Sequence, residues 1–366
     1  MQIIRFERDK SQFMSVLRKN VNDYFKEKGI STKGNWKTAV KSVAMLTIYL
    51  TPFILMLTLP MSGWMIIPLA IIMGIGMAGT GMSVMHDGLH GSSSKKAWLN
   101  NLMGSTIYML GSTTFNWKVQ HNVLHHTFTN IDGMDEDLES KSILRFSVHA
   151  PLKKFHRFQY IYAFFLYSLM MLRKFVNDFI QLHRYNKKGI TRQQNATPAW
   201  EYVKLIGSKI IYFFTIIGLP LMFSDFTWWQ ITIGLVIMLC TGGFIMAIVF
   251  QMAHVVEGVE QPLPTSEGNI ENEWAIHQLQ TTANFARNNT FINWFVGGLN
   301  FQIEHHLFPN ISHIHYRKIS HIVEKTAREY GLPYNMKASF REAIRSHTRM
   351  LKSLGSSVQV PMGSAA

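Results

Sequence analysis

Cysteine and charged residues are both scarce in this sequence. Cys240 is the only cysteine among 366 residues, which excludes a disulfide framework, a cysteine zinc site and a thiolate-held iron–sulfur cluster. Charged residues make up only 16%, against about 25% in an ordinary soluble protein, whereas hydrophobic residues reach 47%. This apolar content also excludes a disordered chain, a collagen and a coiled coil.

Basic residues are missing from two long stretches. No Lys or Arg lies from Ser42 to Ser94 or from Ile210 to Ala286, although the formal net charge is +14. Such an excess fits either nucleic-acid binding or the cytoplasmic flank of a membrane protein, where Lys and Arg accumulate. Because the basic residues flank apolar runs, the membrane interpretation is favoured, and nucleic acid is not an expected partner.

Four apolar runs are long enough to cross a bilayer as helices, which takes about 20 residues. They cover residues 43–61, 64–85, 205–223 and 228–253. The link within each pair is too short to hold a domain, so the runs predict two helical hairpins. Two shorter runs, at residues 102–115 and 158–172, fit helices at the membrane interface better than spans.

The distribution of Lys and Arg predicts the orientation of the chain. Both hairpin links lack them, so the positive-inside rule places the amino terminus, the segment 86–204 and everything after residue 254 in the cytoplasm. The expected fold class is an all-α integral membrane protein with two transmembrane hairpins and a cytoplasmic helical cap. We expect a cytoplasmic segment over residues 1–40, a membrane domain over 41–325, and a cytoplasmic tail over 326–366 whose last dozen residues are loose.

The sequence contains sixteen histidines, and several of them cluster next to the ends of the apolar runs. The candidate ligands are His86 and His90 in HDGLH, His121, His125 and His126 in HNVLHH, His254 in QMAH, and His305 and His306 in QIEHH. Residues four apart share a face of an α-helix, so His121 and His125 are expected to point at one place. His126 is then turned about 100° toward a second place.

Three histidine clusters on one predicted membrane face indicate a metal site. Neutral imidazole suits zinc, copper, iron and nickel. The candidates are too many for one ion, so we expect two ions with about four nitrogens each and open positions for oxygen or water. Haem is disfavoured, because its histidines would lie in the middle of spans. The other histidines are expected to be structural or surface residues, with His313 and His315 as weaker candidates.

These motifs resemble the three histidine boxes of the membrane fatty acid desaturase family. The box spacing and the two-hairpin layout fit that family over about residues 40–325. The resemblance implies a di-iron, O2-dependent enzyme in which the candidate histidines bind two iron ions and no side chain acts as a catalytic acid or base. Gln302 stands where many members have the first histidine of the third box. This Gln is similar to the front-end branch, which places a double bond between an existing one and the carboxyl end, although bacterial members of other specificity also carry it.

The resemblance also has implications for partners. Eukaryotic front-end enzymes usually carry a fused cytochrome b5 domain with the motif HPGG, which does not occur here. A separate electron donor of the ferredoxin or cytochrome b5 type is therefore expected, together with membrane lipids and an acyl-lipid or acyl-CoA substrate. The chain is closer to bacterial and cyanobacterial members, which implies a bacterial inner membrane.

Residues beside the boxes are candidates for supporting roles. Gln302 and Gln251 are expected to orient a ring or a bound water. Asp87 and Glu304 can hold imidazole N–H groups, with a structural or solvent-facing role as the alternative. The acidic segment at residues 129–140 is either a solvated loop or a place for a head group or partner.

The second apolar run contains many glycines. Close helix packing is the simpler explanation, and the wall of a narrow acyl tunnel is the alternative. The lining candidates for such a tunnel, chosen because they lie near the boxes, are Met82, Trp117 and Phe301.

Two other functions share parts of this pattern. A di-iron membrane hydroxylase of lipids, sterols or carotenoids would use the same boxes, although QIEHH and the following LFPNISHIHY favour a desaturase. A non-redox zinc protein, either a lipid hydrolase or a receptor, would need fewer histidines and no reductant.

Overall fold

The computed structural model describes residues 4–8, 10–138 and 143–356. Over these residues the chain is mostly helical, with two short two-stranded sheets. It divides into two compact units, which are described separately. Unit 1 comprises residues 1–34, 120–163 and 249–366, and unit 2 comprises residues 35–119 and 164–248. The boundaries expected near residues 40 and 325 stay predictions, and most of the expected loose tail lies outside the described residues.

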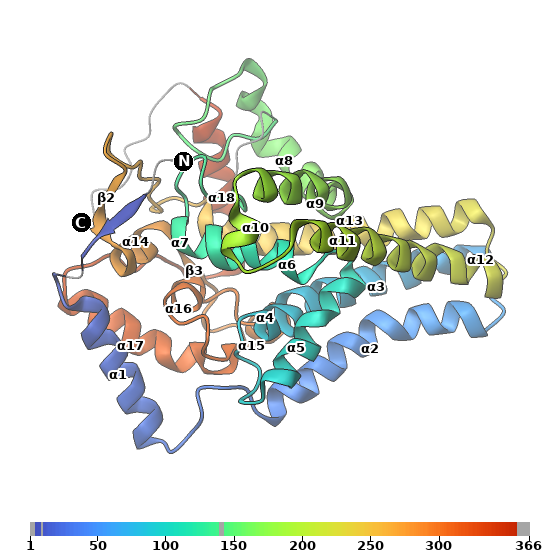
Figure 1. The fold of residues 1–366 in the computed structure, drawn as a ribbon, viewed down its shortest axis with the longest axis horizontal. Helices are drawn as coiled ribbons and strands as arrows, with labels where there is room; N and C mark the ends of the chain where they lie inside the picture. The colour runs from blue at the N-terminus through green and yellow to red at the C-terminus, as the bar shows by residue number, and fades with distance from the viewer. Residues whose placement is uncertain (1–3, 9, 139–142, 357–366) are drawn as a thin grey trace. The chain divides into compact units, whose positions relative to one another are not determined.

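Unit 2 contains the helices that are long and apolar enough to cross a membrane. The last of them continues a few residues into unit 1. The four candidate spans are α2 (Trp36–Thr58), the helix containing α3 (Gly63–Leu89), the helix containing α11 (Pro198–Phe223) and α13 (Trp228–His254). The predicted spans are therefore confirmed, and α2 and α3 form a hairpin (Figure 1). The first helix starts earlier than predicted because the Asn35 side chain caps it, accepting a hydrogen bond from the backbone N of Lys37 at 2.9 Å.

Two of the spans change helix type along their length. The second consists of the turn η1 (Gly63–Met65), α3 (Ile66–Gly79), the π-helix η2 (Thr80–Met85) and α4 (His86–Leu89). The third consists of α11 (Pro198–Phe213), the π-helix η6 (Phe214–Gly218) and α12 (Leu219–Phe223). π-Helical turns occur mostly as short insertions, frequently at functional sites, and η2 leads directly into the first histidine motif.

The glycines of α3 allow neighbouring helices to approach closely. A Cβ added at Gly76 would lie 2.4 Å from the backbone N of Tyr49 in α2. A Cβ at Gly74 would lie 2.6 Å from Cβ of Thr241 in α13. Close packing accounts for these two small residues, as the simpler of the two interpretations predicts.

The two shorter apolar runs do not form candidate spans among the described residues, as expected. The first is divided between α5 (Ala97–Ser105), η3 (Thr106–Leu110) and α6 (Thr114–Trp117). The second falls in α8 (Gln159–Ser168) and α9 (Met170–Lys187), which α10 (Ile190–Gln193) follows.

Unit 1 combines helices with two parallel strand pairs. Strand β1 (Arg5–Glu7) pairs with β2 (Asn269–Glu273), and β3 (Asn284–Phe285) pairs with β4 (Met336–Lys337). The helices of this unit outside α8 and α13 are α1 (Phe13–Glu27), the π-helix η4 (Lys118–His125), α7 (His126–Phe128), η5 (Lys154–Phe158), α14 (Trp274–Thr281), α15 (Thr290–Phe295), α16 (Gln302–Leu307), η7 (His313–His315), α17 (Tyr316–Glu329) and α18 (Phe340–Leu354).

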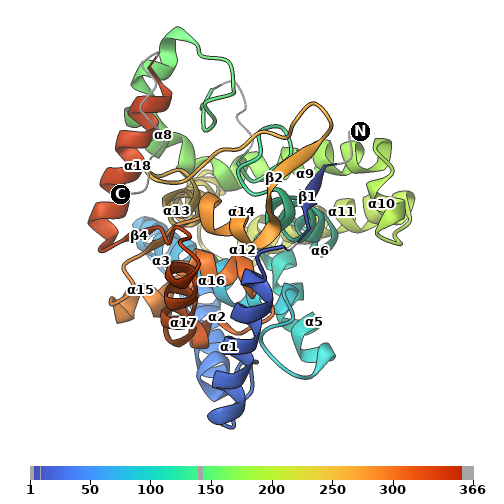
Figure 2. The ribbon, with the colours of Figure 1, turned by 90° about the vertical axis from the view of Figure 1, so that its left-hand side faces the viewer.

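The core of unit 1 holds the third histidine motif in place. Helix α1 is amphipathic and buries residues at helical spacing, including Leu17 and Val21. It lies beside α17, as both views show (Figures 1 and 2). Ile303 and Leu307 of α16 belong to the same buried cluster. The short helix that carries His305 and His306 is therefore fixed by apolar packing on its other side.

Candidate metal centre

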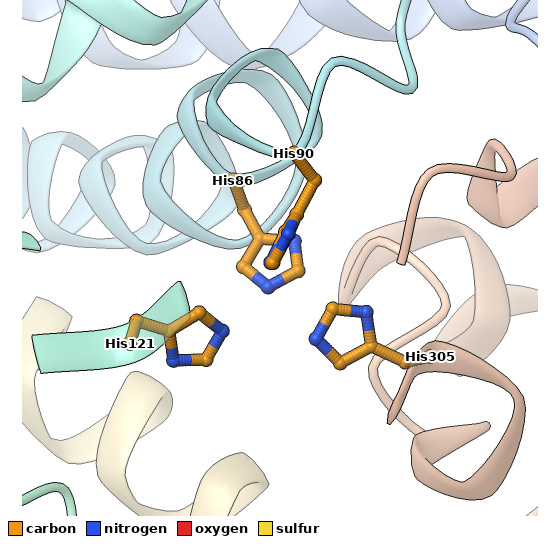
Figure 3. A group of neighbouring side chains, drawn as sticks. All are labelled: His86, His90, His121 and His305. Carbon is orange, nitrogen blue, oxygen red and sulfur yellow. The ribbon is translucent and has the colours of Figure 1, made fainter. Parts of the chain in front are cut away.

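His86 and His90 lie in unit 2, four residues apart along one helix. Their ring centroids are 4.6 Å apart, as the spacing predicts. The indole of Trp117 meets both rings edge-on, at centroid distances of 5.6 and 5.5 Å. Figure 3 shows the two imidazoles extending from the same helix. The first motif thus presents two neighbouring imidazoles, as two ligands of one ion would require.

The second motif lies in the π-helix η4 and at the start of α7, and this geometry adds to the grouping predicted for an α-helix. A π-helix closes i→i+5 hydrogen bonds, so residues five apart are brought toward one side. Nε2 of His121 lies 3.2 Å from Nε2 of His126, five residues on. Two nitrogen ligands of one metal ion are separated by about this distance. The predicted pairing of His121 with His125 is confirmed, because their rings are stacked with centroids 5.2 Å apart. The prediction that His126 points away from His121 is wrong, because the π-helix brings these two rings together as well.

Three of the histidines form the first buried group in unit 1. His125, His254 and His306 are fully buried, and they offer ligand atoms within 4.8 Å of one another. Nε2 of His125, Nε2 of His306 and Nδ1 of His254 have no hydrogen-bond partner among the described residues. Leaving buried polar nitrogens unsatisfied is costly, and coordination of a metal ion removes that cost. This group fits a metal ion held by neutral imidazoles.

A second group adjoins the first. His126, His305 and His306 offer ligand atoms within 4.8 Å of one another, so His306 belongs to both groups. The rings of His121 and His305, which come from separate segments of unit 1, are stacked with centroids 5.9 Å apart (Figure 3). Two adjacent groups suit two neighbouring metal ions better than one.

The rings are held from behind by acidic and amide side chains. Nδ1 of His125 donates to the carboxylate of Asp135 at 2.9 Å, and Nδ1 of His121 lies 2.9 Å from Oδ2 of Asp137. Nδ1 of His306 lies 2.7 Å from Oε1 of Gln278. Such partners fix the tautomer of a ligand histidine and leave Nε2 for the metal. For His125 and His306, Nε2 is also the nitrogen that has no hydrogen-bond partner in the described part of the chain.

The electrostatics of the first group suit a cation. Burial and the neighbouring imidazoles of His126 and His125 hold the pKa of His306 well below its usual range, so this ring is neutral at pH 7. Burial also lowers the pKa of His125, but the Asp135 carboxylate outweighs this effect and the pKa is raised. Neutral imidazole is the ligand form, and a carboxylate behind a ring makes it a stronger donor.

Glu304 does not hold an imidazole, although it lies within the third motif. Its carboxylate accepts hydrogen bonds from Asn284 Nδ2 and from the Tyr334 hydroxyl, both at 2.8 Å. Burial raises the pKa of Glu304 to about 7. The side chain points toward Asn284 of strand β3, so it anchors helix α16. Of the two roles considered for Glu304, the structure therefore shows the structural role and not a contact with an imidazole.

The other proposed supporting residues lie close to the groups. Gln302 is buried, and its Nε2 lies 3.1 Å from Nε2 of His254. Gln251 lies in α13 one turn before His254, and its buried Oε1 has no hydrogen-bond partner among the described residues. Asp87 Oδ1 lies 3.8 Å from Nδ1 of its neighbour His86, beyond normal hydrogen-bond distance.

The tunnel candidates remain predictions. Met82 is buried within η2, and Trp117 contacts the two rings of the first motif. Phe301 packs in the core of unit 1. A small apolar cavity lies within unit 2, with Phe53, Met73 and Met238 among the residues that line it, but none of the three candidates borders it.

Several other histidines have backbone partners instead. A ring nitrogen of His277 donates to the carbonyl of Thr129 at 2.9 Å, and His347 donates to the carbonyl of Val255 at 2.7 Å. Neither these residues nor His313 and His315 join a metal-ligand group among the described residues.

Four side chains that contact the motifs escaped the sequence analysis. They are Asp135, Asp137, Gln278 and Trp274, whose indole donates to the carbonyl of His126 at 3.1 Å. The two Asp residues lie in the acidic segment after the second motif. The sequence does contain a signal for them: the two carboxylates follow the histidines that they contact by ten and sixteen residues.

Comparison with known proteins agrees with this site. Residues 62–338 match the family model described as fatty acid desaturase. The chain is 34% identical over 349 residues to the sn-1 linoleoyl-lipid 6-desaturase of Synechocystis sp., covering 94% of this chain and 96% of that protein. It is 34% identical over 345 residues to a protein of the same name from Arthrospira platensis, covering 93% and 92%. It is 33% identical over 350 residues to the acyl-lipid (8-3)-desaturase of Physcomitrium patens, covering 95% and 72%.

The four spans and the buried imidazoles define a helical integral membrane protein with histidine clusters able to hold metal. The chain belongs to the fatty acid desaturase family. It is therefore an oxidoreductase that acts on fatty acyl chains, as the histidine motifs predicted.

Proposed function

We propose that the protein is an acyl-lipid desaturase whose box histidines hold two iron ions. The observation that carries this proposal is the first buried group, in which three imidazoles present nitrogens that have no hydrogen-bond partner among the described residues. Its relatives are named linoleoyl-lipid and acyl-lipid desaturases, so the proposed substrate is a lipid-linked, already unsaturated acyl chain. The new cis double bond would lie between an existing one and the carboxyl end, the regiochemistry to which Gln302 points.

The proposed ligands are the eight box histidines. Those of unit 1 are His121, His125, His126, His254, His305 and His306. To these the family pattern adds His86 and His90 of unit 2. Imidazole suits iron as well as zinc. Iron is favoured because hydrogen removal from an unactivated methylene needs a redox-active group that no side chain supplies.

The overall reaction requires two electrons from outside the chain. A –CH2–CH2– unit, O2, two electrons and two protons become –CH=CH– and two water molecules. When bound, the two iron ions supply the O2-derived oxidant that removes the two hydrogens.

The chain itself contributes ligand placement and the exclusion of water. Asp135, Asp137 and Gln278 hold the Nδ1 side of three rings, so that each Nε2 keeps one direction. Full burial of the first group keeps water from competing with the substrate. The amide of Gln302, beside His254, restrains that ring.

The proposed partners and location follow the sequence. A separate one-electron carrier of the ferredoxin or cytochrome b5 type would supply the electrons, and the termini and histidine motifs would face the cytoplasm of a bacterial inner membrane.

Fatty-acid analysis tests the proposal. Cells that co-express the chain with a donor would be fed saturated, mono-unsaturated and di-unsaturated acids, and their lipids analysed by gas chromatography–mass spectrometry. We expect a new double bond on the carboxyl side of an existing one, absent from His306→Ala and retained by His183→Ala, whose histidine is exposed. Hydroxylated lipids without new unsaturation would support the hydroxylase alternative, and bound zinc without O2 consumption would support the non-redox one.

A further inference from the structure

The helical segment that follows residue 151 has one buried and one exposed apolar face. The buried face comprises His156, Gln159, Ala163 and Tyr167, none of which is more than 4% exposed. On the opposite face, large apolar residues point outward. Their exposed fractions are 44% for Phe155, 48% for Phe158, 62% for Ile161 and 67% for Phe165. At about 100° per residue, these four lie along one stripe of η5 and α8. We call this stripe the 155–165 face.

A helix exposed to water normally carries polar residues on its outer face. Large exposed apolar patches mark surfaces that another body covers. The 155–165 face therefore needs an apolar occupant.

Basic side chains border this face. Lys153, Lys154 and Arg157 are exposed at its start. The Arg157 guanidinium lies over the Phe158 ring at 4.5 Å, and Lys153 Nζ lies 5.9 Å from the Phe155 ring centroid. No Asp or Glu occurs from Ile143 to Ser168.

The end of helix α18 adjoins this segment. Gln159 Nε2 donates to the carbonyl of Leu351 at 2.8 Å, and Lys352 lies over the Tyr160 ring at 5.7 Å. Lys352 therefore adds a fourth basic side chain beside the face, and the border is cationic.

We propose that the 155–165 face lies in the membrane interface and that its basic border binds the phosphates of anionic phospholipids. Apolar residues on one face with Lys and Arg beside them are the pattern of a helix lying in the plane of a bilayer. The segment is also continuous with membrane-embedded sequence: α8 ends in unit 2, where α9 exposes Val176 and Ile180 and where the candidate spans lie.

An acidic electron carrier is the competing occupant of a basic surface. Such carriers form small, transient and largely polar interfaces, because each encounter must end after one electron has passed. A stripe of outward-pointing aromatic and aliphatic side chains would oppose that release. In a bilayer, the acyl chains would cover the apolar stripe and the lipid phosphates would pair with the cationic border.

Depth-dependent quenching of a site-specific fluorophore tests this assignment. The full chain would carry Cys240→Ser, which removes its only cysteine, and one new cysteine labelled with bimane. The test position is Phe158→Cys, and the control is Arg18→Cys, at an exposed residue of α1. Both variants would be reconstituted into phosphatidylcholine vesicles containing phosphatidylglycerol and doxyl-labelled lipid. We expect strong quenching at position 158 by doxyl groups near the head of the acyl chain, and little at position 18.

A charge variant tests the lipid preference. Replacing Lys153, Lys154 and Arg157 together by Gln should weaken the affinity of this surface for phosphatidylglycerol by about fivefold for each charge removed. Quenching at position 158 by doxyl-labelled phosphatidylglycerol should then fall to the level expected for unbiased mixing of the lipids, and quenching by doxyl-labelled phosphatidylcholine should not weaken. Equal quenching at positions 158 and 18 would overturn the proposal. So would shielding of position 158 only by an added acidic ferredoxin, or only at high protein-to-lipid ratio, which would assign the face to a carrier or to a second copy of the chain.

Discussion

The carboxylate of Asp135 lies 2.9 Å from Nδ1 of His125, ten residues before it in the chain, and both groups are almost completely buried. The same carboxylate accepts hydrogen bonds from the backbone N of Asn130 and of Asp137, at 2.9 and 3.0 Å. The loop after the second motif therefore folds back upon the motif and presents a fixed acceptor to a ring whose other nitrogen faces the first buried group.

Replacing Asp135 by Asn should weaken metal binding. The amide lacks the charge that supports a cation and can present a donor to Nδ1, so we expect about a 10–100-fold loss of iron affinity with the fold retained. Iron remaining after titration with a chelator measures this effect. Asp132→Asn is the matched control, because Asp132 lies in the same loop, acts on Arg145 and has no histidine partner in the described part of the chain; this variant should bind iron as the parent does. Equal retention by both variants would show that Asp135 has no role in metal binding.

Gln278 offers a test that separates shape from hydrogen bonding. Its Oε1 accepts from Nδ1 of His306 at 2.7 Å and from the Thr129 hydroxyl at 2.9 Å. Gln278→Glu keeps an acceptor at this position, whereas Gln278→Leu removes it. We expect iron content near the parent level for Glu and at least about tenfold weaker binding for Leu. If both variants lost iron equally, packing rather than the acceptor would be the property that matters.

The small residues of α3 permit a prediction about stability. At Gly76 a Cβ would lie 2.4 Å from the Tyr49 backbone, which cannot move aside as a flexible side chain can. Gly76→Ala should therefore lower the free energy of unfolding by about 1–3 kcal/mol. Gly207→Ala, in the third span with nothing within 4 Å, should leave it unchanged or slightly raised. Thermal melting of the two detergent-solubilised variants compares them, and similar melting temperatures would contradict the packing argument.

Much of the fold was predictable because bilayer physics leaves strong sequence signals. The long apolar runs predicted four spans, and their bounds moved by a few residues, in part through local effects such as the Asn35 cap. The histidine motifs identified the buried imidazole groups because close sequence spacing places imidazoles near one another. The pairing of His121 with His125 was predictable, but the approach of His126 to His121 was not. A π-helix and an α-helix have no distinct sequence spacing, and tertiary packing decides between them.

The partners of the rings were harder to predict than the rings. Gln278 approaches His306 from 28 residues away, and Thr129 approaches Gln278 from 149 residues away. Such contacts depend on how distant segments pack, which local patterns do not encode. Glu304 shows the converse. It lies beside candidate ligands in the sequence, yet its side chain points away from the imidazoles and accepts hydrogen bonds from Asn284 and Tyr334.

His347 should make the stability of the protein depend on pH. It is fully buried in α18 and donates to the carbonyl of Val255 at 2.7 Å. Burial lowers its pKa to about 4. The unfolded chain takes up a proton near pH 6.5, whereas the folded protein resists protonation until about pH 4. The stability that the neutral ring contributes is therefore fully present above pH 6.5 and is lost as the pH falls toward 4.

The size of this effect follows from the difference between the two pKa values. Each pKa unit corresponds to about 1.4 kcal/mol, so the loss amounts to at most about 3.5 kcal/mol. Because other groups also titrate in this range, the useful quantity is the difference between the parent and His347→Gln, which keeps a donor for Val255 but does not titrate. Chemical denaturation at pH 7.5, 6.0 and 5.0 should show the parent losing stability faster than the variant. His183→Gln, at an exposed position, should follow the parent, and parallel curves for all three proteins would show that His347 does not control the acid sensitivity of the fold.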